Sequence, residues 1–135
     1  MSEPLDARRE SALRWLDYAR RDLKNARASL ADEDLLGLAA FHAQQTAEKA
    51  LKAYAVWLGV SKIPKTHKLI RLAGIVREAG GDSFSEEELA ELTDYAVDGR
   101  YPDTPVPGKV AAVQAVEFAA SVYELVRERV GQVKE

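Results

Sequence analysis

Four polar residues that can bind an anion recur at helical spacing in the first half of the chain: His42, Gln45, Lys49 and Lys52. They fall at i, i+3, i+7 and i+10, which places them on one side of a helix. The two lysines supply ammonium donors and Gln45 supplies a neutral amide donor, a set that suits a phosphate. The alternative is a solvated helix face, on which a Glu48–Lys52 pair at i, i+4 contributes roughly 0.3–0.5 kcal/mol.

A second group with chemical capacity is the run Arg100-Tyr101-Pro102-Asp103. An arginine can hold a phosphate through two parallel hydrogen bonds, and a tyrosine can stack on a base or donate from its hydroxyl. The alternative is that Arg100 ties a loop to a helix end and that Tyr101 packs in the core. The spacing alone leaves both interpretations open.

The two histidines, His42 and His67, are 25 positions apart and show no zinc-ligand spacing. His67 follows Thr66 at an expected helix start, where a capping-turn role is the ordinary interpretation. The chain contains no cysteine, which excludes disulfides and thiolate ligands, and it has neither a glycine-rich phosphate loop nor a GxSxG motif. We therefore expect no metal and no cofactor.

The composition is that of one globular domain, residues 1–135 with a core of about 12–130. Hydrophobic residues make up 47% and charged residues 30% of its 135 residues, and the net charge of −3 argues against bulk coating of nucleic acid. The N-terminus lacks the apolar core of a signal peptide. The longest uncharged run, Leu35 to Ala47, is too short to span a bilayer. We expect a soluble, cytoplasmic protein that does not contact membranes.

Apolar residues at intervals of three or four predict helices nearly throughout. The first, about 5–31, presents the apolar residues Leu13, Leu16, Ala19, Leu23, Ala26 and Leu30. Asp32 or Asp34 can cap the second helix, which we expect to end at Leu58 with Gly59 at the C′ position. The second helix also carries a stripe of small residues where another helix can approach closely: Ala40, Ala43, Ala47, Ala50 and Tyr54.

Three shorter or later helices complete the prediction. Thr66 can cap a third helix from His67 to about Ala79, and Gly80 and Gly81 end it. Ser85 and Glu88 form a capping box for a fourth helix to about Val97, and a last helix covers about 110–130. No strand-like alternation persists. The fold class is all-α: an up-and-down bundle of four to five helices whose two long N-terminal helices form a hairpin.

Taken together, these segments resemble the HEPN family of small helical domains. The similarity extends from about Ala12 to Val130 and lies in the following pieces: Tyr18–Leu23, Phe41–Lys52, Thr66–Leu69, Tyr95, Arg100–Asp103 and the closing apolar helix. The resemblance implies a helical bundle that commonly dimerises. It also implies a partner, since prokaryotic members are often encoded beside a minimal nucleotidyltransferase as a toxin–antitoxin pair.

Many members of this family are metal-independent ribonucleases that use an arginine followed after four to six residues by a histidine. This chain departs from that motif. No histidine follows Arg100 at such a distance, and no arginine precedes His42 or His67 correctly. In such pairs the nucleotidyltransferase can attach adenylate to a tyrosine near the active site, and Tyr101 is the position that matches here.

We therefore expect a homodimer or higher homo-oligomer that binds a nucleotide or RNA phosphate and pairs with a nucleotidyltransferase-type protein. The resemblance and the spacing assign the ligand to six residues: Arg100, Tyr101, Lys49, Lys52, Gln45 and His42. One alternative is a metal-independent endoribonuclease with an atypical site, in which Arg100 stabilises the phosphorane and His67 or His42 moves the proton. Another is a structural adaptor, in which Arg100 and Tyr101 serve packing.

Overall fold

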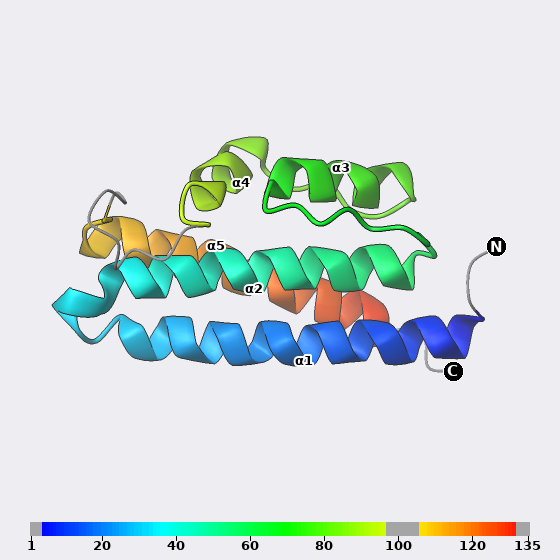
Figure 1. Ribbon diagram of the computed structural model, residues 1–135, viewed down its shortest axis with the longest axis horizontal. Helices are drawn as coiled ribbons and strands as arrows, with labels where there is room; N and C mark the ends of the chain where they lie inside the picture. The colour runs from blue at the N-terminus through cyan, green and yellow to red at the C-terminus, as the bar shows by residue number, and fades with distance from the viewer. Residues whose placement is uncertain (1–3, 97–105, 132–135) are drawn as a thin grey trace.

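The computed structural model describes residues 4–96 and 106–131, and within these ranges the fold is all-α, as predicted. The helices are α1 (Leu5–Ser29), α2 (Leu36–Trp57), α3 (Leu69–Glu78), α4 (Glu86–Thr93) and α5 (Lys109–Gly131), with one 3₁₀ turn, η1 (Glu33–Leu35), before α2. The long helices α1 and α2 form the predicted hairpin. Figure 1 shows α5 behind this hairpin and α3 and α4 on the side of α2 away from α1.

The centre of the bundle is α2, which packs against α1, α5, α3 and α4. Its small-residue stripe is buried as expected, since Ala40, Ala43, Ala47 and Ala50 are fully inaccessible and Tyr54 is 3% exposed. Small side chains allow α1 and α5 to approach the α2 backbone closely. Leu13 was predicted to lie on the apolar side of the first helix together with Leu16 and Ala19, but in α1 it is 42% exposed.

Two glycines end helices as the sequence indicated. Gly59 and Gly80 have φ values of 96° and 101°, a region that glycine enters without steric cost. At α2, the Val60 N–H donates to the Ala55 carbonyl and the Gly59 N–H to the Val56 carbonyl, each at 3.0 Å. This Schellman pattern satisfies the last carbonyls of α2 and turns the chain back towards the side on which α3 packs.

Helix starts are partly as predicted. Ser85 Oγ accepts from the Glu88 N–H at 3.2 Å, as predicted. The Asp32 side chain accepts from the Asp34 N–H at 2.9 Å and so caps η1. The prediction that Asp32 or Asp34 caps the second helix is wrong, because α2 starts directly after η1 without a side-chain cap hydrogen bond. The prediction that α3 starts at His67 with Thr66 as its cap is wrong, because the helix begins at Leu69. The Leu69 N–H instead donates to Thr93 Oγ1 at the end of α4 (3.2 Å), so a tertiary hydrogen bond replaces a local cap.

The fourth helix is shorter than predicted, ending at Thr93 and not near Val97. None of the helices in the described ranges combines the length and the hydropathy that crossing a lipid bilayer requires.

Candidate functional site

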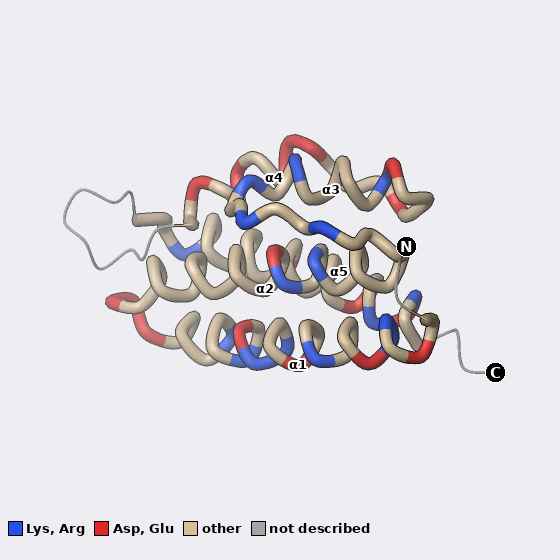
Figure 2. The backbone as a smooth tube through the Cα atoms, turned by 45° about the vertical axis from the view of Figure 1, so that its right-hand side comes forward, with Lys and Arg blue, Asp and Glu red and all other residues tan. Residues whose placement is uncertain are grey.

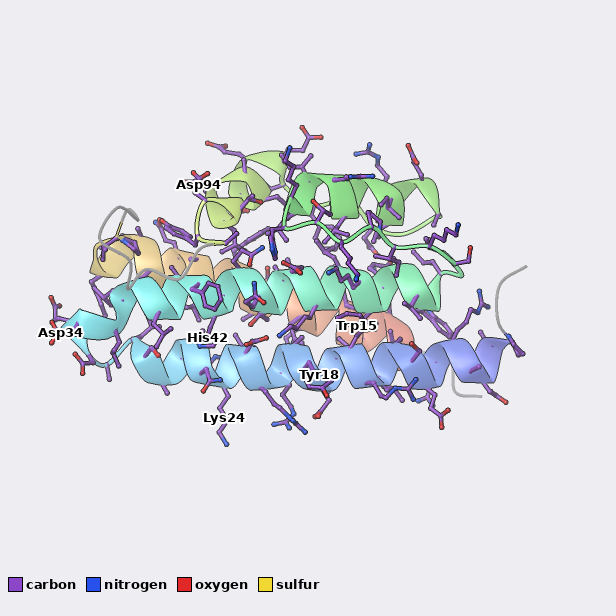
Figure 3. All side chains as sticks on the ribbon, in the orientation of Figure 1. Trp15, Tyr18, Lys24, Asp34, His42 and Asp94 are labelled. Carbon is purple, nitrogen blue, oxygen red and sulfur yellow. The ribbon has the colours of Figure 1, made fainter. Side chains whose placement is uncertain are left out.

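A half-exposed stripe of α2 runs between α1 and the segment that connects α2 to α3. All four residues of the predicted polar stripe, His42, Gln45, Lys49 and Lys52, are partly exposed on it. Figure 3 places His42 along the junction of α1 and α2, where Trp15 of α1 also lies. The structure thus brings these four residues to one side of one helix, as their spacing predicted.

Asp22 of α1 organises one end of this stripe. His42 Nδ1 lies 3.0 Å from Asp22 Oδ1, and Lys49 Nζ donates to Asp22 Oδ2 at 2.5 Å. The Asp22 side chain is 12% exposed, so the His42 imidazole and the Lys49 ammonium both contact a carboxylate that is largely removed from water. One carboxylate of α1 therefore fixes two side chains that lie seven positions apart on α2.

The charge state of Asp22 follows from these contacts. Burial alone would raise the pKa of its carboxyl, but the hydrogen bonds from His42 and Lys49 and the charge of Lys49 hold the pKa below its ordinary value. Asp22 is therefore a carboxylate at neutral pH. It presents a fixed negative charge to the imidazole of His42 and to the ammonium of Lys49.

Glu48 organises the other end of the stripe. Its Oε1 lies 2.9 Å from His67 Nδ1 and accepts from Gln44 Nε2 at 3.2 Å, and its Oε2 accepts from Lys52 Nζ at 3.0 Å. Burial of Glu48 opposes ionisation, but the hydrogen bonds from His67, Lys52 and Gln44 outweigh it, so the pKa of its carboxyl is lowered. The interpretation of Glu48 and Lys52 as a solvated pair is wrong, because their side chains are only 7% and 12% exposed.

Two further contacts connect the stripe to its surroundings. Gln45 Nε2 donates to Gln44 Oε1 at 2.7 Å, which links the partly exposed Gln45 to the buried Glu48 network. Lys52 Nζ lies 5.6 Å from the centre of the Trp15 ring, over its face, a cation–π contact that holds the ammonium towards α1.

Of the remaining sequence predictions, His67 joins this site through Glu48, and its side chain is 66% exposed. Arg100 and Tyr101 lie outside the described residues. Sequence reasoning missed Asp22 and Gln44. The burial of Asp22 could have been predicted, because it lies three positions after Ala19 and four before Ala26, at the edge of the buried face of α1.

In charge, the stripe is balanced when both imidazoles are neutral, because two carboxylates, Asp22 and Glu48, face two ammonium groups, Lys49 and Lys52. Each ammonium has three donors, and its carboxylate occupies one of them. Among the residues that the structure describes, neither histidine Nε2 has a hydrogen-bond partner. Within the same residues, no three His, Asp or Glu side chains gather so as to hold a metal ion.

Comparisons with known proteins bear on this geometry. The family model of the HEPN domain matches residues 12–129 of the chain. Among solved structures, the crystal structure of an archaeal HEPN homologue matches with a TM-score of 0.63 at 23% sequence identity, over 88% of this chain and 97% of that one. At this identity the structural match establishes a shared fold alone. No curated protein matches the chain.

Proposed function

This chain belongs to the HEPN domain family, and we propose that it binds the phosphate of a nucleotide or of RNA on the stripe of α2 that carries His42, Gln45, Lys49 and Lys52. The observation that carries the proposal is the way two buried carboxylates hold these side chains. Asp22 holds His42 and Lys49, and Glu48 holds Lys52 and His67. Side chains held in this way lose little conformational entropy when they bind a ligand.

The donors that remain on the stripe suit a phosphate. Lys49 and Lys52 each keep ammonium hydrogens that their carboxylates do not use, and these lie along the same side of α2 as Gln45.

Further ligand contacts are assigned from the sequence. Arg100 and Tyr101, with their capacity for phosphate and base contacts, complete the proposed ligand set, and Tyr101 is the proposed site of adenylate attachment.

We also propose a homodimer or higher oligomer that pairs with a nucleotidyltransferase-type protein in a toxin–antitoxin-like system; membership of the HEPN family supports this part. Light scattering of the pure protein tests the oligomer. The intact mass after co-expression with such a partner tests Tyr101, and an unmodified mass would contradict that assignment.

The decisive experiment places a negative charge on the stripe. Gln45 is half-buried at its centre, so Gln45→Glu puts a carboxylate beside the proposed phosphate. The change removes the hydrogen bond to Gln44 Oε1 but replaces none of the residues that pair with Asp22 and Glu48. We expect the affinity for ATP, measured by calorimetry, to fall at least about tenfold. The matched control is Gln114→Glu on the exposed surface of α5, which makes the same change in charge elsewhere and should alter affinity less than about twofold. Equal losses in the two variants, or no binding by the unchanged protein, would overturn the proposal.

A second candidate function is metal-independent RNA cleavage, and one observation favours it. Each histidine is bound at Nδ1 by a carboxylate, and this orientation leaves Nε2 to act as a general acid or base. Incubation of total RNA with the protein in excess chelator tests this function. Cleavage that disappears in His67→Gln or His42→Gln would favour it over simple binding. If the unchanged protein does not cleave, this candidate is removed.

A further inference from the structure

A groove of about 580 Å³ lies between α4 and α5, apart from the α2 stripe. The lining residues of α4 and the turn after it are Glu87, Glu88, Glu91, Leu92 and Tyr95, and those of α5 are Ala111, Gln114, Ala115, Glu117, Phe118 and Ser121. The lining shares no residue with the Asp22 and Glu48 clusters. The groove is therefore a second surface that phosphate binding on α2 does not explain.

The floor of this groove is a face of α5 that no other helix covers within residues 4–96 and 106–131. On α5, Ala111, Ala115, Phe118 and Ser121 lie at i, i+4, i+7 and i+10, the spacing of a stripe that packs against another helix. Phe118 and Tyr95 are only partly buried against the core. This row and the side chains of Leu92 and Tyr95 opposite it line the kind of groove into which an amphipathic helix fits its apolar side.

Among the residues that the structure describes, the charged side chains that line the groove are all acidic. Glu87, Glu88 and Glu91 come from α4 and Glu117 from α5, and no described Lys or Arg lines it. Figure 2 shows acidic residues gathered along α4. Glutamates in the first turn of a helix are common, because their charge interacts favourably with the helix dipole. This explanation does not apply to Glu91, which lies beyond the first turn of α4, or to Glu117, which belongs to α5.

The electrostatic environment of Tyr95 is consistent with this acidic lining. Burial raises the pKa of the Tyr95 hydroxyl, and the nearby charges of Glu91 and Asp94 raise it further. An apolar floor with a uniformly acidic rim is complementary to a helix with one apolar side and flanking lysines or arginines.

We propose that the α4–α5 groove docks a basic amphipathic helix of a partner protein. The apolar side of that helix packs on Phe118 and Tyr95, and its cations pair with the glutamates of the rim. Because exposed ion pairs are screened by salt, the association weakens as ionic strength increases.

The test uses an amphipathic helical peptide of leucine and lysine, with its leucine–glutamate counterpart as the specificity control. The protein variant is Glu88→Gln/Glu91→Gln/Glu117→Gln, and the matched control is Glu10→Gln/Glu33→Gln/Glu78→Gln, which makes the same change in net charge at exposed sites outside the groove. We expect the lysine peptide to bind the unchanged protein and the control variant alike, and the groove variant at least about tenfold more weakly.

Amide chemical shifts of the labelled protein provide the second readout, and on titration with the lysine peptide they should change along α4 and the first half of α5. Equal weakening in the two triple variants would show attraction to net charge alone and would overturn the proposal. Equal binding of the glutamate peptide, shift changes confined to other helices, or no binding of the lysine peptide at low salt would also overturn it. Phosphate binding on α2 is measured separately, so the two proposals can fail independently.

Discussion

Nδ1 of His67 lies 2.9 Å from Oε1 of Glu48, although 19 positions separate the two residues in the chain. Gln44 strengthens this connection, because its amide donates to the same Oε1 and to the His67 carbonyl, each at 3.2 Å. The segment that leads into α3 is thus fastened to the middle of α2 by a carboxylate that is 7% exposed. Glu48 therefore supports both the layer formed by α3 and α4 and the position of a candidate site residue.

Replacing Glu48 by Gln should destabilise the fold. The substitution keeps the side-chain volume but removes the charge that Lys52 and His67 contact, and it leaves the largely buried Lys52 ammonium without its counter-ion. We expect the free energy of unfolding in urea to fall by about 2–3 kcal/mol. The control Glu91→Gln, at an exposed position of α4, should change it by less than about 0.5 kcal/mol. Equal unfolding midpoints for the two variants would contradict this role of Glu48.

Asp22 and Lys49 should be energetically coupled across the α1–α2 junction. Asp22→Asn leaves Lys49 with a weaker acceptor, and Lys49→Met leaves a largely buried carboxylate with only His42. A double-mutant cycle on unfolding free energies should therefore give a coupling of about 1–3 kcal/mol. Additive single substitutions would show that the 2.5 Å contact between Lys49 Nζ and Asp22 Oδ2 contributes nothing to stability.

Acid should destabilise the protein, and Asp82 contributes to this loss in a defined pH window. Hydrogen bonds from Arg129 and then from Tyr54 lower the pKa of Asp82 from 3.8 to about 2. The unfolded chain therefore takes up this proton at a higher pH than the folded chain does. The stabilisation by Asp82 is complete above about pH 4 and is lost as the pH falls towards 2. The pKa values of Asp22 and Glu48 are also lowered, so they act in the same direction.

Urea unfolding at about pH 5, 3.5 and 2.5 measures this effect. The side chains of Asp82 and Arg129 are 26% and 37% exposed, so solvent screening weakens the contribution of the pair to stability. Asp82→Asn should lower stability at pH 5 and flatten its dependence between pH 5 and 2.5. A variant that is as steep as the unchanged protein would show that other carboxylates dominate.

The elements of the fold were predictable because their signals are local. Gly59 and Ser85 act through conformations and hydrogen bonds within a few residues of themselves, so their sequence context suffices. The start of α3 was not predictable, because the Leu69 N–H finds its acceptor on Thr93, 24 positions away. A tertiary acceptor leaves no trace in the residues next to the helix start.

The candidate site, like the fold, was predictable only where its signals are local. That His42, Gln45, Lys49 and Lys52 share one side of a helix follows from helical periodicity. What they contact does not, because Asp22 belongs to another helix and is one of several acids in α1. Asp17 is another acidic residue of α1 that could have been expected to contact α2, but it pairs with Arg20 and Arg21 on the exposed side of α1. Only the burial of one side of α1 distinguishes the two aspartates.

Two glycines of the α3 region should respond oppositely to alanine. A Cβ at Gly81 would lie 2.5 Å from Val76 Cγ1, 2.9 Å from Leu58 Cδ1 and 3.1 Å from Tyr54 Cζ. Val76 is fully buried, and the Tyr54 hydroxyl is hydrogen-bonded to Asp82. Room for the new Cβ therefore requires α3 to move away from α2. We expect Gly81→Ala to lower the free energy of unfolding by about 1–3 kcal/mol.

At Gly74, inside α3, a Cβ would meet nothing within 4 Å, and φ is not positive. Gly74→Ala should therefore raise the free energy of unfolding by about 0.5–1 kcal/mol, because alanine loses less backbone entropy in a helix. Urea unfolding of the two variants side by side measures both effects. A rise in the free energy of unfolding for Gly81→Ala would show that the close approach of Gly81 to α2 does not limit the packing of α3, and a fall for Gly74→Ala would contradict the gain from helix propensity.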